Sequence, residues 1–243
     1  DHLDYHGDLN GYYEAKERLF NTLLPEGSGA VLNADDFRYH DLLNACRLQG
    51  HRVITFGRES HDIQLVNVDL HDQGQDLKIK VFGKIYNFHL PLVGVIQSYN
   101  VLCALGLAMA CNFNEEDVID VLPRLQSVPG RFEWVGNLPN HTKVFVDFAH
   151  TPNAIETVLT SLKPHAKGSM HLVMGCGGNG DKTIRPLMGQ IAQSLADYVY
   201  VTDDNPRSED PNAIRKAIME ACPQAKNIGD RRKAITTALE NCK

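Results

Sequence analysis

Long hydrophobic runs, an excess of positive charge and closely paired cysteines are all missing from this sequence of 243 residues. The longest apolar stretches are much shorter than a bilayer span and no signal peptide is evident, so we expect no membrane insertion. A formal net charge of -6 argues against a surface that binds nucleic acid or anionic lipid. None of the six cysteines forms a C-x-x-C pair, and such scattered thiols are typical of a reduced protein of the cytoplasm.

The composition, 43% hydrophobic and 22% charged, is sufficient to bury one large core or two modest ones. Short β-branched runs alternate with segments of helical periodicity, which predicts an α/β fold. The chain begins with Asp1 rather than methionine, directly on a motif of histidines and aspartates. We therefore interpret it as a segment of a longer protein.

A polar turn follows the predicted buried strand at 198–202 and precedes a predicted helix that begins beyond Pro211. Ligands of open α/β sheets bind just outside the carboxyl ends of the strands, which is where this turn would lie. Asn205 can donate and accept hydrogen bonds, Pro206 stiffens the turn, and Arg207 offers a planar fork that suits a carboxylate. A plain strand-to-helix turn with aspartate caps fits the same residues equally well.

The beginning of the chain carries an H-x-D-x-H pattern made of His2, Asp4 and His6. On an extended segment these alternate positions would point the same way and could hold a divalent metal ion. The alternative is a turn whose histidines hydrogen-bond backbone groups.

Asn33 and Asp36 follow a predicted strand at 29–33 and could bond a purine edge or cap the next helix. Four short strands are predicted at 52–56, 63–68, 77–82 and 85–90, with a hairpin at 83–84.

Four glycines within six residues follow the predicted strand that begins at His171, as in loops that cradle phosphate. However, Asp181 separates the glycines from Lys182, whereas a phosphate loop needs glycine and lysine to be adjacent. The carboxylate would also repel phosphate. We therefore exclude an ATP phosphate loop at 175–183.

The sequence Asp204-Asn205-Pro206-Arg207 resembles a signature of the Mur ligase family, in the branch that adds meso-diaminopimelate to UDP-N-acetylmuramoyl-L-Ala-D-Glu. Further segments resemble the family in the same order along the chain, namely 1–7 with 13–16, 33–36, 94–100, 129–133, 147–152 and 175–188. The resemblance implies the later part of a central ATP-binding domain at 1–131 and a Rossmann-like C-terminal ligase domain at 132–243, both α/β.

The resemblance implies ATP and Mg²⁺ as cofactors. His2 matches a magnesium ligand, and Lys16 matches a lysine that is carbamylated and so gains the oxygen donors that Mg²⁺ prefers. An exposed helix lysine is the plain alternative for Lys16.

The nucleotide would be bound by residues of both domains. Asn33 and Asp36 match positions near adenine and Arg131 matches an arginine that reaches the nucleotide. Asp147 would meet the ribose and His150 the phosphates. The alternative for Arg131 is an ordinary surface arginine. The alternative for Asp147 and His150 is a capped helix start.

The incoming amino acid would be held by Asp204, Asn205, Pro206 and Arg207. Gly180 stands where the family places an arginine on a diaminopimelate carboxylate, which puts the amino-acid selectivity in question. Arg185 could compensate for the arginine that is missing at position 180.

The activity implied is ATP-dependent amide ligation through an acyl phosphate in peptidoglycan synthesis, by a cytoplasmic monomer. The family's phosphate loop would precede residue 1, so we expect the isolated chain to be an inactive fragment. Three alternatives remain: a lysine-adding sister ligase, a metal-dependent hydrolase built on His2, Asp4 and His6, and a non-catalytic binding fragment.

Overall fold

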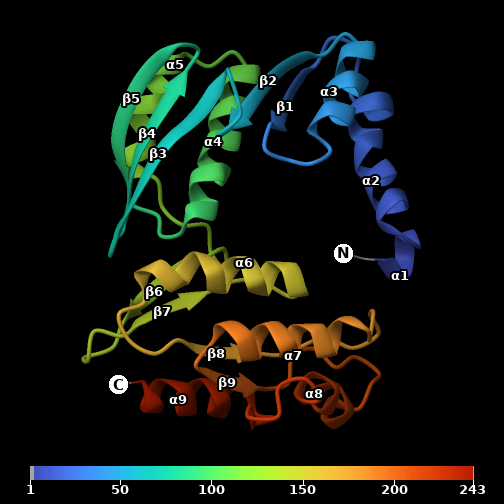
Figure 1. Ribbon diagram of the computed structural model, residues 1–243, viewed down its shortest axis with the longest axis vertical. Helices are drawn as coiled ribbons and strands as arrows, with labels where there is room; N and C mark the ends of the chain where they lie inside the picture. Colours follow the sequence, from blue (N-terminus) through green and yellow to red (C-terminus); the bar gives the residue numbers. More distant parts are fainter. Residues whose placement is uncertain (1–2, 243) are drawn as a thin grey trace. The chain divides into compact units, whose positions relative to one another are not determined.

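The computed structural model describes residues 3–242 (Figure 1). The chain divides into two compact units, one of which comprises His6–Gln126 while the other is built from Ser127 onward. The division lies near residue 131, where the sequence predicts a domain boundary. Each unit is a mixed α/β structure, as predicted.

The first unit contains α2 to η2, and the short helix α1 precedes it. The elements are α1 Leu3–His6, α2 Leu9–Arg18, the π-helical turn η1 Leu19–Leu23, β1 Gly29–Asn33, α3 Tyr39–Leu48, β2 Arg52–Gly57, β3 Ile63–His71, β4 Gly74–Val81, β5 Lys84–Leu90, α4 Val95–Ala110, α5 Glu115–Val121 and the 3₁₀ turn η2 Leu122–Arg124. The four strands predicted after residue 50 are all present.

The sheet of this unit has the order β1-β2-β3-β4-β5. The pairs β1–β2 and β2–β3 are parallel, and β3, β4 and β5 form an antiparallel meander. Phe82 and Gly83 make the tight turn between β4 and β5, both with positive φ (43° and 95°), because such turns match the twist of the strands. The predicted hairpin is therefore confirmed, one residue earlier than expected.

The core of the first unit lies between the sheet and α4. Leu102 and Leu105 of α4 pack with buried side chains of β3 and β4, such as Ile63 and Ile79. Gly106 lets α4 lie close to β1, because a Cβ there would be 2.7 Å from Val31 Cγ1. A smaller cluster that includes Ala30, Leu32 and Cys46 joins β1 to α3. The parallel end of the sheet is thus covered by helices, as such sheets require.

The second unit contains β6 to α9. Its elements are β6 Glu133–Asn137, β7 Lys143–Val146, α6 Pro152–Leu162, the 3₁₀ turn η3 Lys163–His165, β8 His171–Met174, α7 Ile184–Leu195, β9 Tyr198–Val201, α8 Pro211–Met219, β10 Lys226–Asn227 and α9 Arg231–Asn241. Strands β6 and β7 form a separate antiparallel pair, while β10, β9 and β8 form a parallel sheet in that order.

Helices cover the parallel sheet of the second unit, and Figure 1 shows α7 and α9 on opposite sides of it. Met188 of α7 and Ile218 of α8 are fully buried in the core, together with Val201 of β9. The predicted helix start after Thr151 is confirmed, since Thr151 Oγ1 accepts the Ala154 N–H at 3.4 Å and proline follows at the first helical position. In the part of the chain that is described, no helix has the length and apolarity needed to cross a membrane.

Candidate functional site

Two loops of the second unit leave the same edge of the parallel sheet. Met174, at the end of β8, pairs in register with Val201, at the end of β9. The glycine-rich loop at 175–183 follows β8, and the loop at 202–210 follows β9. Because parallel strands end at one edge, the two segments that the sequence singles out lie side by side at the position where α/β sheets bind ligands.

The two loops approach each other more closely than side chains would allow. A Cβ on Gly178 would lie 2.0 Å from the carbonyl oxygen of Pro206, and one on Gly175 would lie 2.6 Å from that of Thr202. Both distances are shorter than any real contact of a Cβ atom. The glycines are therefore explained by backbone-to-backbone packing of the loops.

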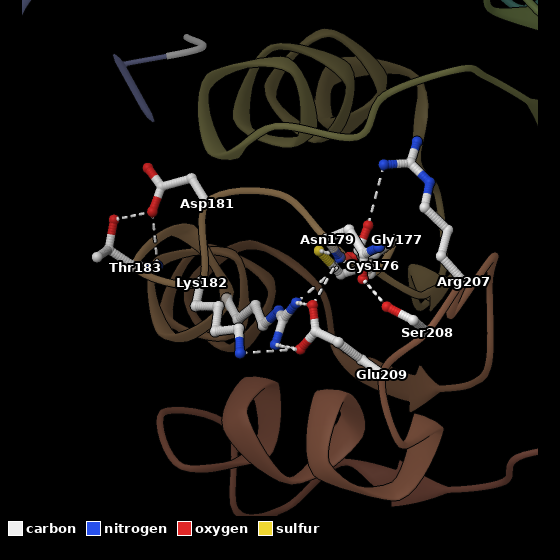
Figure 2. Close-up of polar contacts among 11 residues, drawn as sticks. Cys176, Gly177, Asn179, Asp181, Lys182, Thr183, Arg207, Ser208 and Glu209 are labelled. Atoms are coloured by element: carbon white, nitrogen blue, oxygen red, sulfur yellow. Dashed lines mark hydrogen bonds and ion pairs between the residues drawn. The ribbon is translucent and has the colours of Figure 1, made fainter. Parts of the chain in front are cut away.

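Hydrogen bonds join the two loops at residues that are predicted to bind the amino-acid substrate. The Gly178 N–H donates to the carbonyl oxygen of Asn205 at 2.8 Å, and Arg207 Nη1 donates to the carbonyl oxygen of Gly178 at 3.1 Å. Ser208 Oγ donates to Asn179 Oδ1 at 2.8 Å. Figure 2 shows Arg207 and Ser208 extending toward the glycine-rich loop from one side. The guanidinium of Arg207 thus bonds a backbone carbonyl rather than a carboxylate.

Arg185 faces the interior, whereas Arg207 is exposed. Arg185 Nη1 and Nη2 donate to the two carboxylate oxygens of Glu209 at 3.0 and 2.9 Å, and only 4% of the Arg185 side chain is exposed. Lys182 Nζ lies 3.4 Å from Glu209 Oε2. The hydrogen bond from Arg185, followed by the N–H of Asn179, lowers the pKa of Glu209 to about 2. Arg185 therefore stabilises the two loops through its ion pair with Glu209.

Glu209 was not singled out from the sequence. It follows Arg207 by two residues, but nothing local indicates that its partners are Arg185, 24 residues away, and Asn179, 30 residues away. Gly180, in contrast, stands in open space, with no atom within 4 Å of an added Cβ. The Asp181 carboxylate bonds Thr183, two residues further on, whose hydroxyl and N–H lower the pKa of the Asp181 carboxyl.

The base of the 202–210 loop is fixed by Asp203. Its N–H donates to the carbonyl oxygen of Gly229 at 3.1 Å, and its carboxylate pairs with the largely buried Arg215 of α8. Arg215 also donates from Nε to Asn227 Oδ1 at 2.7 Å. Asp204, the first residue of the predicted signature, is exposed. The crevice behind the loop, lined by Asp203 and Arg215 among others, has no room for a water molecule.

The predicted nucleotide residues of the second unit gather around Phe148. The guanidinium of Arg131 lies 4.9 Å from the centre of the Phe148 ring, and the His150 ring packs edge-on against it at 5.2 Å. Asp147 Oδ2 accepts the Phe132 N–H at 2.7 Å and Oδ1 accepts the Ala149 N–H at 2.8 Å. The structure therefore brings Arg131 and His150 together at the ring of Phe148, a residue that is 62% exposed, while Asp147 bonds the neighbouring backbone.

In the first unit, Asn33 and Asp36 serve local turns. Asn33 Oδ1 accepts the Asp35 N–H at 3.0 Å, and Asp36 Oδ1 accepts the Arg38 N–H at 2.8 Å, just before α3 begins. Their neighbour Asp35, which the sequence did not single out, bonds the Arg58 and Glu59 N–H groups at 2.8 Å each. Asp35 thus links the end of β1 to the turn after β2.

Lys16 is exposed on α2, and its ammonium lies 4.7 Å from the centre of the Tyr12 ring, one helical turn earlier. His2 lies outside the described residues. From Leu3 onward the segment is not extended: Leu3–His6 forms a short helix, in which positions two apart do not share a face. Among the residues that the structure describes, no three His, Cys, Asp or Glu side chains are grouped so as to hold a metal ion.

Comparison with family models matches both parts of the chain. Residues 1–108 match the Mur ligase middle domain, and residues 130–243 match the Mur ligase glutamate ligase domain. The two matches follow each other along the chain in the order that the sequence motifs predict.

Individual relatives agree with the family models. The chain is 46% identical over 239 residues to a UDP-N-acetylmuramoyl-L-alanyl-D-glutamate–2,6-diaminopimelate ligase of Caulobacter vibrioides, a match that covers 98% of this chain and 49% of the relative. A solved structure of a ligase with the same name is 31% identical, with a TM-score of 0.61, over 100% of this chain and 50% of that one.

A folylpolyglutamate synthase of Mycobacterium tuberculosis, solved with ADP and AMPPCP, shares the fold with a TM-score of 0.78 at 23% identity, over 99% of this chain and 54% of that one. The chain spans about half the length of the curated relatives it matches.

Proposed function

Because the chain belongs to the Mur ligase family, we propose that it forms the middle and C-terminal part of the ligase that adds meso-diaminopimelate to UDP-N-acetylmuramoyl-L-Ala-D-Glu. This step of peptidoglycan synthesis serves cell-wall formation, cell shape and division. The observation that carries the proposal is the exposed Arg207, held by Gly178 on a loop at the carboxyl edge of the sheet, in a chain 46% identical to a ligase of that name.

The reaction must overcome the poor reactivity of a carboxylate. An oxygen of the D-glutamate side-chain carboxylate bonds the γ-phosphorus of ATP, the bond from that phosphorus to ADP breaks, and ADP leaves behind an acyl phosphate. An amine of diaminopimelate then attacks the carbonyl carbon, so that a C–N bond forms, the C–O bond to phosphate breaks, and the amine loses a proton. The protein's part is to position the two reactants and to stabilise the charge that develops.

Arg207 and Asn205 would hold a carboxylate of the incoming amino acid. A guanidinium can form two parallel hydrogen bonds to a carboxylate, which fixes the orientation as well as the position of the ligand. Arg207 donates through Nη1 to the carbonyl oxygen of Gly178, and among the residues that the structure describes no carboxylate pairs with its charge. Asp204 and Pro206 complete the loop that presents this fork. Arg185, committed to Glu209, would act by supporting the loop.

The group of Arg131, Asp147, Phe148 and His150 would bind ATP. Two side chains that can carry positive charge flank an exposed aromatic ring, and such a set suits phosphate oxygens next to a flat base or sugar. In the other unit, Asn33 and Asp36 would lie near adenine. A folylpolyglutamate synthase of the same fold was solved with ADP and AMPPCP, which is in keeping with a nucleotide site.

Mg²⁺ would be held by His2 and by Lys16 in its carbamate form. The ammonium of Lys16 is exposed, so carbon dioxide can reach it once it is neutral. The carbamate would supply hard oxygen ligands of the kind that Mg²⁺ prefers, and the ion would offset the charge of the phosphates. Mass spectrometry under bicarbonate should show a gain of one carboxyl group, which Lys16→Gln abolishes.

We place the enzyme in the cytoplasm, as a monomer.

The full-length protein that contains this chain provides the test. Incubated with UDP-N-acetylmuramoyl-L-Ala-D-Glu, ATP, Mg²⁺ and labelled meso-diaminopimelate, it should form the labelled tripeptide nucleotide together with ADP and phosphate. Arg207→Ala should reduce amino-acid incorporation sharply. Absence of product from the unmodified protein, with every substrate present, would refute the proposal.

A lysine-adding ligase is the second candidate, because Gly180 stands in open space where an arginine would otherwise meet a carboxylate. Lysine lacks the second carboxylate of diaminopimelate and would not need that arginine. Equal concentrations of the two labelled amino acids, offered together, should yield almost only the diaminopimelate product. A dominant lysine product would decide for the second candidate.

A further inference from the structure

One carboxylate, that of Glu209, contacts Asn179 and Lys182 of the glycine-rich loop and Arg185 of α7. Oε1 accepts the Asn179 N–H at 2.6 Å and Arg185 Nη2 at 2.9 Å. Oε2 accepts Arg185 Nη1 at 3.0 Å and lies 3.4 Å from Lys182 Nζ. Figure 2 shows the Lys182 side chain extending toward the Glu209 carboxylate. A single side chain of the 202–210 loop therefore contacts three residues of the neighbouring loop and helix.

This contact is charged and persistent. The Glu209 side chain is 16% exposed, so its bonds to Arg185 are only weakly screened by water. The carboxyl group has a pKa of about 2, mainly because Arg185 bonds its charged form. Glu209 consequently stays ionised throughout the range in which an enzyme works. The contact is a fixed part of the site and does not switch with pH.

The backbone on both sides of the contact is held in an uncommon conformation. Asn179 has φ of 59° and Arg207 has φ of 51°, a left-handed region that side chains other than glycine rarely adopt. Such conformations persist only where surrounding bonds enforce them. Glu209 supplies one of these bonds directly at the Asn179 N–H, and its own N–H donates to the carbonyl oxygen of Pro206 at 2.9 Å.

The direction of the Arg207 side chain depends on the same loop. Its Nη1 donates to the carbonyl oxygen of Gly178, and that carbonyl belongs to the peptide group whose N–H, on Asn179, binds Glu209. One peptide plane therefore carries Glu209 on its N–H side and Arg207 on its C=O side. A rotation of this plane would release both at once.

From this geometry we infer that Glu209 is a positioning residue for the amino-acid substrate, which orients the Arg207 guanidinium through the Gly178–Asn179 peptide and the buried Arg185. The inference rests on the proposed function. It assigns the orientation of the carboxylate-binding fork to a residue that does not itself touch the substrate. A misplaced fork loses bidentate binding, so affinity for the amino acid falls while the nucleotide site is unchanged.

The test compares three variants of the full-length protein. Glu209→Gln removes the charge, Glu209→Asp keeps the charge but shortens the reach, and Glu240→Gln makes the same change as the first at an exposed position of α9. KM for meso-diaminopimelate should rise by about tenfold to a hundredfold in Glu209→Gln and by less in Glu209→Asp. KM for ATP and for the dipeptide nucleotide should stay within about twofold in every variant.

A role in folding alone would look different. It would lower the amount of active enzyme and leave all three KM values unchanged, and that result would overturn the inference. If Glu209→Gln does not fold, Glu209→Asp decides by the same criterion. In the 243-residue chain, the Asn179 amide hydrogen should also exchange faster in Glu209→Asp than in Glu240→Gln, and equal rates would count against the contact.

The inference and the proposed function fail separately. If the unmodified protein does not ligate diaminopimelate, the proposed function is wrong. If it does, and Glu209→Gln has an unchanged KM for that substrate, only the role of Glu209 is wrong.

Discussion

The hydroxyl of Tyr99 donates to Asp35 Oδ2 at 2.7 Å and so ties α4 to the turn after β1. The same carboxylate accepts the N–H groups of Arg58 and Glu59. Gly57, with φ of 128°, brings the end of β2 so close that a Cβ there would lie 2.8 Å from the Asp35 carboxylate. Asp35 is therefore the point at which two strand ends and a helix of the first unit are joined.

Removal of this carboxylate should weaken the first unit. Asp35→Ala deprives two backbone N–H groups and one hydroxyl of their acceptor, and we expect a loss of about 1–2 kcal/mol because the site is partly open to water. The neighbouring Asp36→Ala removes a single local bond and should cost about 0.5–1 kcal/mol. Urea unfolding of the two variants measures the difference, and equal midpoints would contradict the central role of Asp35.

The tyrosine of the pair predicts a dependence on alkaline pH. Burial, followed by the hydrogen bond to Asp35, raises the pKa of Tyr99 to about 12. Because this value lies above that of the unfolded chain, roughly 10, the contribution to stability is complete below pH ~10 and is lost as the pH rises toward 12. Tyrosinate absorbance should show late-ionising tyrosines. Tyr86 is another of them, because its hydrogen bond to Glu115 raises its pKa to about 12, so Tyr99→Phe should reduce their number by one. A variant with an unchanged titration would show that Tyr99 is not one of them.

Local patterns predicted the strand before the glycine-rich loop, the helix after it and the capped start of α6. They could not tell which member of an adjacent aspartate pair has a structural role. In both pairs the first member bonds a residue that is remote in the sequence: Asp35 bonds Tyr99, 64 residues away, and Asp203 bonds Arg215, 12 residues away. Of the second members, Asp36 accepts the nearby Arg38 N–H and Asp204 is exposed. Partners this remote leave no periodic signal, so only the folded chain reveals them.

Substitution by alanine should lower the stability of the protein at one glycine of this loop and leave it nearly unchanged at another. Gly178→Ala would place a Cβ 2.0 Å from the Pro206 carbonyl oxygen, so a loop must shift, and we expect a cost of about 1–3 kcal/mol. Gly180→Ala enters open space and should change stability by no more than about 0.5 kcal/mol. Urea unfolding of both variants checks this. Comparable losses would mean that the loops are not packed as described.

Arg215 should be indispensable for the second unit. Its side chain is 9% exposed and is matched by Asp203 and by Asn227, so Arg215→Met leaves a carboxylate without its counter-charge. We expect a loss of about 3–5 kcal/mol. Arg232→Met, at an exposed position of α9, is the matched control and should be nearly silent. Thermal unfolding of the chain measures both, and a silent Arg215→Met would show that the ion pair contributes little.

Two conservative substitutions should separate the amino-acid site from the nucleotide site. Arg207→Lys replaces a planar fork with a point charge, so KM for diaminopimelate should rise by about tenfold or more while KM for ATP is unchanged. Arg131→Lys, beside Phe148, should do the reverse, because its guanidinium lies over the aromatic ring. Steady-state kinetics of the full-length protein, with each substrate varied in turn, measures the crossed pattern. If both variants raise the same KM, the assignment of Arg207 and Arg131 to different substrates is wrong.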